Sequence, residues 1–259
     1  MAAGQDPLAS QAPIRVRPLV ETADLLEAVR LQKMVWGFSD IDLLPPRLFV
    51  VAGKIGGQVL GAFDGERMAG FCLAIPGLKP GGKYYLHSHM LGVMEEYQNR
   101  GIGRMLKLAQ RSEALERAIE LIEWTFDPLE IKNSHFNLQR LGAIVRRYVP
   151  NQYGVSSSPL HGGLPTDRCV AEWWVSSARV RSILEGGSPI RYTIERRIEV
   201  PRRIGDWKRT DPEQARQIQT RVREEFEHWL GRGLAVVGYE SAPAGGAFLL
   251  GPPPAEARP

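Results

Sequence analysis

The segment from Tyr84 to Gly103 joins an apolar strand to a glycine-rich turn and a helix. The turn reads Gln98-Asn99-Arg100-Gly101-Ile102-Gly103, and Arg104 follows it. The two glycines let the backbone fold tightly, so that several N–H groups point at one place, and the positive end of the helix dipole adds to them. Arg100 and Arg104 bring positive charge beside the turn. This pattern predicts a pyrophosphate-sized anion site on the N–H groups of residues 99–104.

The spacing of the glycines argues against two other nucleotide sites. The turn lacks the Gly-Lys-Ser/Thr end of a P-loop. A dinucleotide-binding turn would follow the first strand of a parallel sheet and carry a third glycine. The glycines alone do not exclude an ordinary strand-to-helix turn in which they only relieve backbone strain.

Two histidines on the same strand are candidates for a general base. His87 and His89 are two residues apart, so we expect them to share one face of the strand with Leu91. An imidazole titrates near neutrality, and His89 is the preferred base because it lies nearer the glycine turn. The alternative is that both pack on the sheet surface. Glu95, just past the strand, could act through water instead, and no metal site is predicted because further ligands at a recognisable spacing are missing.

The elements that position these residues follow from hydrophobic periodicity and turn signals. The fold class is α/β (α+β), with a mixed, mostly antiparallel sheet flanked by helices. In the helix after the glycine turn we expect Lys107 to face water. Asp64-Gly65 predicts a hairpin, and the order strand, helix, strand over 121–149 predicts a βαβ unit. Strands are expected at 14–20, 58–63, 67–75, 84–94, 121–126, 143–149, 169–175, 191–200, 234–240 and 246–250, and helices at 22–36, 48–51, 102–119, 130–141, 178–184 and 212–230.

The pattern Q-x-x-G-x-G after a long strand, together with this order of elements, resembles the GNAT superfamily of acyl-CoA N-acyltransferases. The resemblance covers residues 14–175 and is strongest over 84–145. It implies acyl-CoA as co-substrate. The backbone of Leu91, Gly92 and Val93 would pair with the pantetheine arm, residues 98–104 would bind the pyrophosphate, and Asn133 would bond the arm. A free N–H on the strand would stabilise the oxyanion as an amine attacks.

The sequence departs from the family at the residue that protonates the leaving thiolate. The family often has a tyrosine late in the helix that follows the next strand, where this chain has Leu138 to Leu141. The nearest tyrosines are Tyr148 and Tyr153, so either one of them is the acid, with Tyr148 as the candidate, or the thiolate leaves unaided. Asn137 either bonds the acceptor or caps a neighbouring loop.

The acceptor is expected between the loop after the first helix and residues 148–153. Trp36 and Phe38 with Asp40 and Asp42 would suit a cationic amine by charge and by cation–π contact. The same residues could equally form a capped surface loop. The predicted function is transfer of an acetyl or other acyl group from acyl-CoA to a primary amine of a small molecule. The alternatives are a non-catalytic acyl-CoA-binding or regulatory module and an interaction role centred on the residues from 188 onward.

Composition bounds the partners and the location. The chain has 259 residues and a net charge of +4 whose charges are interspersed, so no nucleic-acid partner is indicated. Cys72 and Cys169 lie in apolar runs and are interpreted as buried thiols. No segment predicts a membrane span or a leader, so a cytoplasmic location is expected.

The domain organisation is predicted as a frayed start at 1–13, a GNAT core at 14–186 and an extension at 187–259. Asp211 is the expected N-cap of the helix 212–230. This helix should dock on the core or on a second subunit, so a homo-oligomer is possible.

Overall fold

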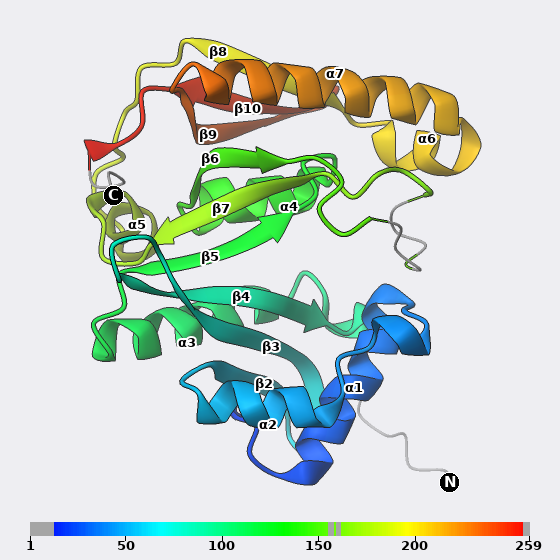
Figure 1. Cartoon of the computed structure of the whole chain (residues 1–259), viewed down its shortest axis with the longest axis vertical. Helices are drawn as coiled ribbons and strands as arrows, with labels where there is room; N and C mark the ends of the chain where they lie inside the picture. Colours follow the sequence, from blue (N-terminus) through cyan, green and yellow to red (C-terminus); the bar gives the residue numbers. More distant parts are fainter. Residues whose placement is uncertain (1–12, 155–157, 159–161, 256–259) are drawn as a thin grey trace, which may run out of the picture.

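The computed structural model describes residues 13–154, 158 and 162–255, and ten strands form one continuous sheet through these residues (Figure 1). The strands are β1 (Arg15–Pro18), β2 (Gln58–Asp64), β3 (Arg67–Leu78), β4 (Tyr84–Val93), β5 (Leu121–Phe126), β6 (Ile144–Val149), β7 (Arg168–Trp174), β8 (Arg196–Pro201), β9 (Ala235–Ala242) and β10 (Gly245–Gly251). The helices are α1 (Thr22–Trp36), α2 (Pro46–Lys54), α3 (Ile102–Glu116), α4 (Ile131–His135), α5 (Ala178–Glu185), α6 (Ile204–Thr210) and α7 (Pro212–Gly231), with 3₁₀ turns η1 (Asp40–Asp42) and η2 (Glu95–Tyr97) and a π segment η3 (Phe136–Arg140).

The sheet runs in the order β1-β2-β3-β4-β5-β7-β6-β9-β10-β8. The first four strands form an antiparallel meander, and Gly65 adopts φ 58° in the β2–β3 turn, as the hairpin signal predicts. The mixed, mostly antiparallel sheet confirms the predicted fold class. The predicted βαβ unit is present in split form: β5 and β6 run parallel with α4 between them in the chain, but β7 lies between them in the sheet and is antiparallel to both.

Strands β4 and β5 are paired over only two residues. Their parallel ladder consists of Leu86 opposite Ile122 and His87 opposite Glu123. Beyond these pairs the two strands separate toward their C-terminal ends (Figure 1). The backbone edge of β4 from Ser88 onward is therefore not covered by β5.

Helices α1 and α3 lie on opposite faces of β4. A Cβ placed on Gly92 would meet the ring of Trp36 in α1 at 2.8 Å, whereas a Cβ placed on Gly103 in α3 would meet Leu91 at 3.6 Å. Neighbouring residues of a strand point to opposite faces, so Leu91 and Gly92 define the two sides of the sheet at this point. α1 begins at Thr22 as predicted, and its N-cap residue, Glu21, makes no side-chain capping hydrogen bond.

The last third of the chain continues the same sheet and shares its core. Ile198, Val222, Phe226 and Phe248 are fully buried in the same hydrophobic cluster as Trp173 of β7. α7 begins at the predicted cap, where the Asp211 carboxylate accepts from the N–H of Gln214, and packs against β6 and β8 (Figure 1). α6 was not predicted. No helix in the described ranges is long and apolar enough to cross a membrane.

The docking of α7 predicts a large loss of stability in the variant Phe226→Asp. Phe226 stacks on Tyr148 of β6 with ring centroids 5.1 Å apart and meets Phe248 of β10 at 5.0 Å. Truncation of a buried phenylalanine costs about 3–5 kcal/mol, and a buried carboxylate adds to this. We expect chemical denaturation to show at least this loss. Thr220→Asp, at an exposed position of the same helix, should stay within about 0.5 kcal/mol. Similar stabilities for both variants would contradict the docking.

Candidate active site

The glycine turn forms a helix N-terminus whose first N–H groups have no acceptor within the helix. Asn99 and Gly101 adopt φ 60° and φ 81°, a left-handed conformation that favours glycine and asparagine. The first hydrogen bond of α3 runs from the N–H of Met105 to the carbonyl of Gly101, at 3.0 Å. The N–H groups of residues 102–104 therefore have no acceptor within the helix. This is the geometry of an anion site, and Arg100 and Arg104 flank it.

The uncovered edge of β4 leads directly to this turn. The N–H of Met94 donates to the carbonyl of Ala69 at 2.9 Å, so residues 94 and 69 form a hydrogen-bonded pair. Such pairs alternate along an antiparallel ladder, which places the N–H and C=O groups of Leu91 and Val93 on the side away from β3. An extended ligand lying in the gap could pair with them as an additional strand would.

A cleft of about 550 Å³ lies where β4 and β5 separate. Residues from both strands, from α3 and α4 and from the loops after α1 and β6 line it. They are Trp36, Phe38, Asp42, Leu44, Ser88, His89, Met90, Leu91, Lys107, Thr125, Phe126, Asp127, Glu130, Lys132, Asn133, Phe136, Asn137, Tyr153, Thr166 and Arg168. The described residues hold no group of three metal-ligating side chains.

His89 lines this cleft at a β-bulge. Leu73 pairs with Met90 and Ala74 with Ser88, so His89 is the extra residue of β4. Bulges re-aim side chains and are frequent beside active sites. The bulge also corrects the prediction that both histidines share a face with Leu91. Ser88 and Leu91 both lie toward α3, so alternation is broken between them, and the ring of His87 lies with that of His89 on the other side of the strand.

The two imidazoles are held mainly neutral. Their ring centroids are 6.1 Å apart. Desolvation lowers the pKa of His87 to about 4, with the neighbouring His89 as a second cause, and partial desolvation lowers the pKa of His89 below its usual value. A neutral imidazole at physiological pH can accept a proton, and His89 is the one of the two that lines the cleft.

Lys107 is buried, which corrects the prediction that it faces water. Only 3% of the residue is exposed to solvent, and it lies on the buried face of α3 with Leu106, Gln110 and Ala114. The signal was the spacing of Gly103, Lys107, Gln110 and Ala114 by three or four residues, which puts them on one helix face. The positive charge of a lysine, taken by itself, predicts a solvent-exposed side chain.

Helix α4 and the π segment η3 that follows it bring one asparagine each to the cleft. The side-chain amide of Asn137 donates to Asn133 Oδ1 at 3.3 Å, and Asn137 is buried. The π turn that follows is closed by the N–H of Leu141 donating to the carbonyl of Phe136, at 3.0 Å. Wide turns of this kind are frequent at functional sites. Both asparagines line the cleft between β4 and β5.

Comparison with protein families identifies one domain within the chain. Residues 24–142 match the family model of the acetyltransferase (GNAT) family. The chain contains a GNAT acetyltransferase domain. No curated protein matches the chain.

Solved structures of low sequence identity share the fold of this domain. A protein from Desulfovibrio desulfuricans described as belonging to the GNAT family has 16% identity and a TM-score of 0.50 over 63% of this chain and 100% of that one. The yncA protein of Salmonella typhimurium, solved with its cofactor acetyl-CoA, has 15% identity and a TM-score of 0.52 over 64% and 96%. NAA60 of Arabidopsis thaliana, solved with a bisubstrate analogue, has 16% identity and a TM-score of 0.51 over 62% and 98%.

The two tyrosines considered as acids of the GNAT domain lie in different places. Tyr148 does not line the cleft, because it points into the core shared with α7 and its hydroxyl donates to Asp167 at 2.7 Å. Desolvation and this carboxylate raise its pKa far above the usual value. Tyr153 does line the cleft, with its hydroxyl 2.9 Å from Thr125 Oγ1.

The loop after α1 contributes an aromatic pair to the GNAT cleft. Trp36 and Phe38 stack with centroids 5.7 Å apart, and Asp42 lies with them in the cleft lining. Asp40 instead pairs with Lys33 at 2.5 Å. Ser158, in the loop between β6 and β7, donates to the carbonyl of Trp36 at 2.6 Å and so ties that loop to α1.

Glu95 lies outside the cleft of the GNAT domain. It is exposed in η2, beyond the end of β4, and its neighbour Glu96 pairs with Arg67. The role of Glu95 as a base stays a prediction that this geometry does not favour.

The C-terminal elements hold two loops of the GNAT cleft. Lys208 of α6, itself buried, donates to Asp127 at 3.0 Å and to Glu130 at 2.8 Å, which fixes the connection between β5 and α4. Arg223 of α7 donates to both carboxylate oxygens of Asp167 at 2.9 Å, at the end of the loop between β6 and β7. Sequence patterns gave no sign of these long-range ion pairs.

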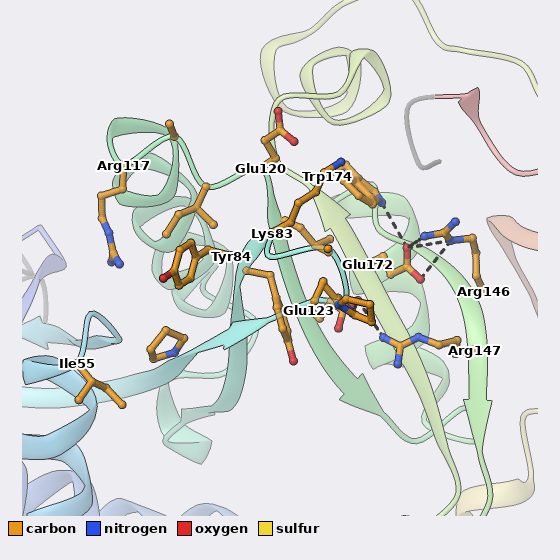
Figure 2. A pocket seen from close by; sticks show the side chains of 18 residues that line it. Ile55, Lys83, Tyr84, Arg117, Glu120, Glu123, Arg146, Arg147, Glu172 and Trp174 are labelled. Atoms are coloured by element: carbon orange, nitrogen blue, oxygen red, sulfur yellow. Dashed lines mark hydrogen bonds and ion pairs between the residues drawn. The ribbon is translucent and has the colours of Figure 1, made fainter. Parts of the chain in front are cut away.

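A larger pocket of about 1170 Å³ lies at the other end of β4 (Figure 2). Its wall includes Arg117 past the C-terminus of α3, and a 15-residue helix separates this wall from the glycine turn by about 22 Å. Figure 2 shows its buried Glu172 paired with Arg146 and its Glu123 with Arg147. Lys79 also pairs with Glu123, so these carboxylates are already neutralised. The uncovered edge of β4 lines the smaller cleft and not this pocket.

Proposed function

We propose that the cleft between β4 and β5 binds acyl-CoA and transfers the acyl group, acetyl in the first instance, to a primary amine of a small molecule by direct attack. The observation that carries this proposal is the uncovered edge of β4 ending at a turn of unpaired N–H groups. Acyl-CoA carries a thioester on an extended arm that ends in a pyrophosphate. The arm matches the strand edge, and the pyrophosphate matches the N–H groups of the turn. The GNAT family supports the same reaction class.

In this proposal the backbone of Leu91 and Val93 pairs with the pantetheine arm. The pyrophosphate lies on the N–H groups of residues 102–104, with Arg100 and Arg104 adding charge and Asn133 bonding the arm from α4. An N–H of β4 would then stabilise the oxyanion that forms as the amine attacks, because such a donor is already oriented and shielded from water.

The acceptor would enter between the aromatic pair and Tyr153. Trp36, Phe38 and Asp42 offer two ring faces and a carboxylate, which suit a cationic amine. Ser158 donates to the carbonyl of Trp36 at 2.6 Å, so this residue also lies beside the aromatic pair. A primary amine of a small molecule is the acceptor that we propose for this end of the cleft.

The direct test follows the release of free thiol when the protein is mixed with acetyl-CoA and a panel of primary amines. We expect release that depends on the amine, with CoA binding measured separately by calorimetry. CoA binding without amine-dependent release would support the non-catalytic module instead. Absence of CoA binding would overturn the proposed site.

A further inference from the structure

Lys107 places a buried ammonium at the closed end of the cleft. Its Nζ donates to Ser88 Oγ of β4 at 2.8 Å and lies 3.7 Å from the ring centroid of Trp124 of β5. Ser88 and Trp124 are the residues that directly follow the last paired residues of the two strands, His87 and Glu123. The ammonium therefore lies where the two strands part.

The partners of this ammonium are all uncharged. The Ser88 hydroxyl donates to Gln110 Oε1 at 3.0 Å, which leaves its oxygen lone pairs to accept from Lys107. No carboxylate in the described part of the chain forms an ion pair with Nζ. A buried charge without a counter-ion is costly, so stability alone does not explain a lysine here. A site that receives negative charge during a reaction does explain it.

The developing negative charge of the proposed reaction is the thiolate of CoA. An arm that runs along Leu91 and Val93 away from the glycine turn ends toward Ser88, on the α3 side of the sheet. His89 lies at the bulge beside His87, which points to the other side. The cleft thus has a cation on the side of the thiol and an imidazole on the side of the acceptor.

We propose that Lys107 is the acid that protonates the departing thiolate, a proposal that rests on the proposed acyl transfer. The amine nitrogen forms a bond to the acyl carbon, and the carbon–sulfur bond breaks with its electron pair going to sulfur. Sulfur takes a proton from Lys107 Nζ, and the proton lost by the attacking amine goes to His89 or water. Solvent then returns a proton to Lys107. The tyrosine missing from α4 is thereby replaced by a lysine from α3.

The electrostatic surroundings suit this role. Desolvation lowers the pKa of Lys107 to about 7, below that of an ordinary thiol at about 8.5, so proton transfer to the thiolate is favourable. Burial raises the pKa of Cys72 on β3 to about 12, so its thiol stays neutral. The other titratable or charged groups around the cleft are His87 and His89 on β4, Asp127 and Glu130 paired with Lys208, Lys132 at α4, Arg168 on β7, Asp42, and Glu113 farther along α3.

The test titrates the thiol of bound CoA by its ultraviolet thiolate absorbance, in the wild type, in Lys107→Met and in Lys107→Arg. A nearby cation lowers a thiol pKa. We expect the wild-type complex and the arginine variant to hold about tenfold more thiolate at neutral pH than the methionine variant. Equal thiol titration in three complexes that all bind CoA would overturn the role of Lys107 and leave acyl-CoA binding intact. No CoA binding by the wild type would defeat both proposals.

A kinetic arm separates acid catalysis from a structural role. Lys107→Met should reduce kcat by about 10²–10⁴-fold. In the wild type, kcat should fall as pH rises through the pKa of Lys107, because the acid must be protonated, and both variants should lose this descending limb. Lys107→Arg keeps the charge but does not release a proton at these pH values, so it should restore only part of the rate. An unchanged pH profile in both variants would contradict the proposal.

Discussion

CoA affinity should fall by about a hundredfold or more when Gly101 is replaced by leucine. Gly101 is the N-cap of α3 at φ 81°, and a Cβ there would meet no atom within 4 Å. The loss would come from the backbone, because an L-residue disfavours this conformation and would rotate the N–H groups of residues 102–104 away from one point. Two lost charge-assisted hydrogen bonds of about 1.5–3 kcal/mol each account for this factor. Calorimetry with CoA measures it.

Gly186→Leu is the matched control for this experiment. Gly186 ends α5 at φ 82°, and a Cβ placed there would likewise meet no atom within 4 Å. Both variants should lose about 1–2 kcal/mol of folding free energy, since the strain is the same. Only the change at Gly101 should affect CoA. Equal CoA affinity in the wild type and Gly101→Leu would place the pyrophosphate elsewhere.

Local signals predicted the parts of this site that depend on neighbouring residues. The turn at Gly101 and the hairpin at Gly65 need left-handed backbone, and glycine is the residue that adopts it without cost. The cap of α7 at Asp211 is equally local. Such features depend on a few consecutive residues, so they can be predicted without knowing the tertiary fold.

The parts that sequence patterns missed depend on packing between distant elements. Lys107 is buried because its side chain packs between α3 and the two strands, where it contacts Ser88 of β4 and Trp124 of β5. A lysine on a helix is normally solvated. Tyr148 leaves the cleft because Phe226 of α7 stacks on it and Asp167 accepts its hydroxyl. No periodicity encodes these contacts.

The bulge in β4 is a further case, and it determines which histidine reaches the cleft. Strict alternation predicts His87, His89 and Leu91 on one face. One extra residue in β4 breaks this alternation, so Leu91 turns toward α3 and His89 lines the cleft. A bulge depends on the pairing partner, here Leu73 and Ala74 of β3, and is not visible in the strand's own sequence.

Replacement of His89 by alanine should lower kcat/KM by about 10²–10⁴-fold, the range for removal of a general base. His89 lines the cleft, whereas His87 lies beside it opposite Glu123. The base must be neutral to accept the proton of the amine. Because desolvation lowers the pKa of His89 below its usual 6.5, the wild-type rate should fall only as pH drops below that value. Rate profiles against pH for the two variants measure this.

His87→Ala is the matched control, since it removes an identical ring from the same strand. Desolvation lowers the pKa of His87 to about 4, so its titration lies below the expected limb. We expect His87→Ala to keep most of the wild-type rate and the acidic limb of the pH–rate profile that reflects the titration of His89. His89→Ala should lose both the rate and this limb. If both variants keep the height and shape of the wild-type profile, water carries the proton from the amine directly. If His87→Ala alone lowers the rate, the base is His87 and the bulge serves to shape the cleft.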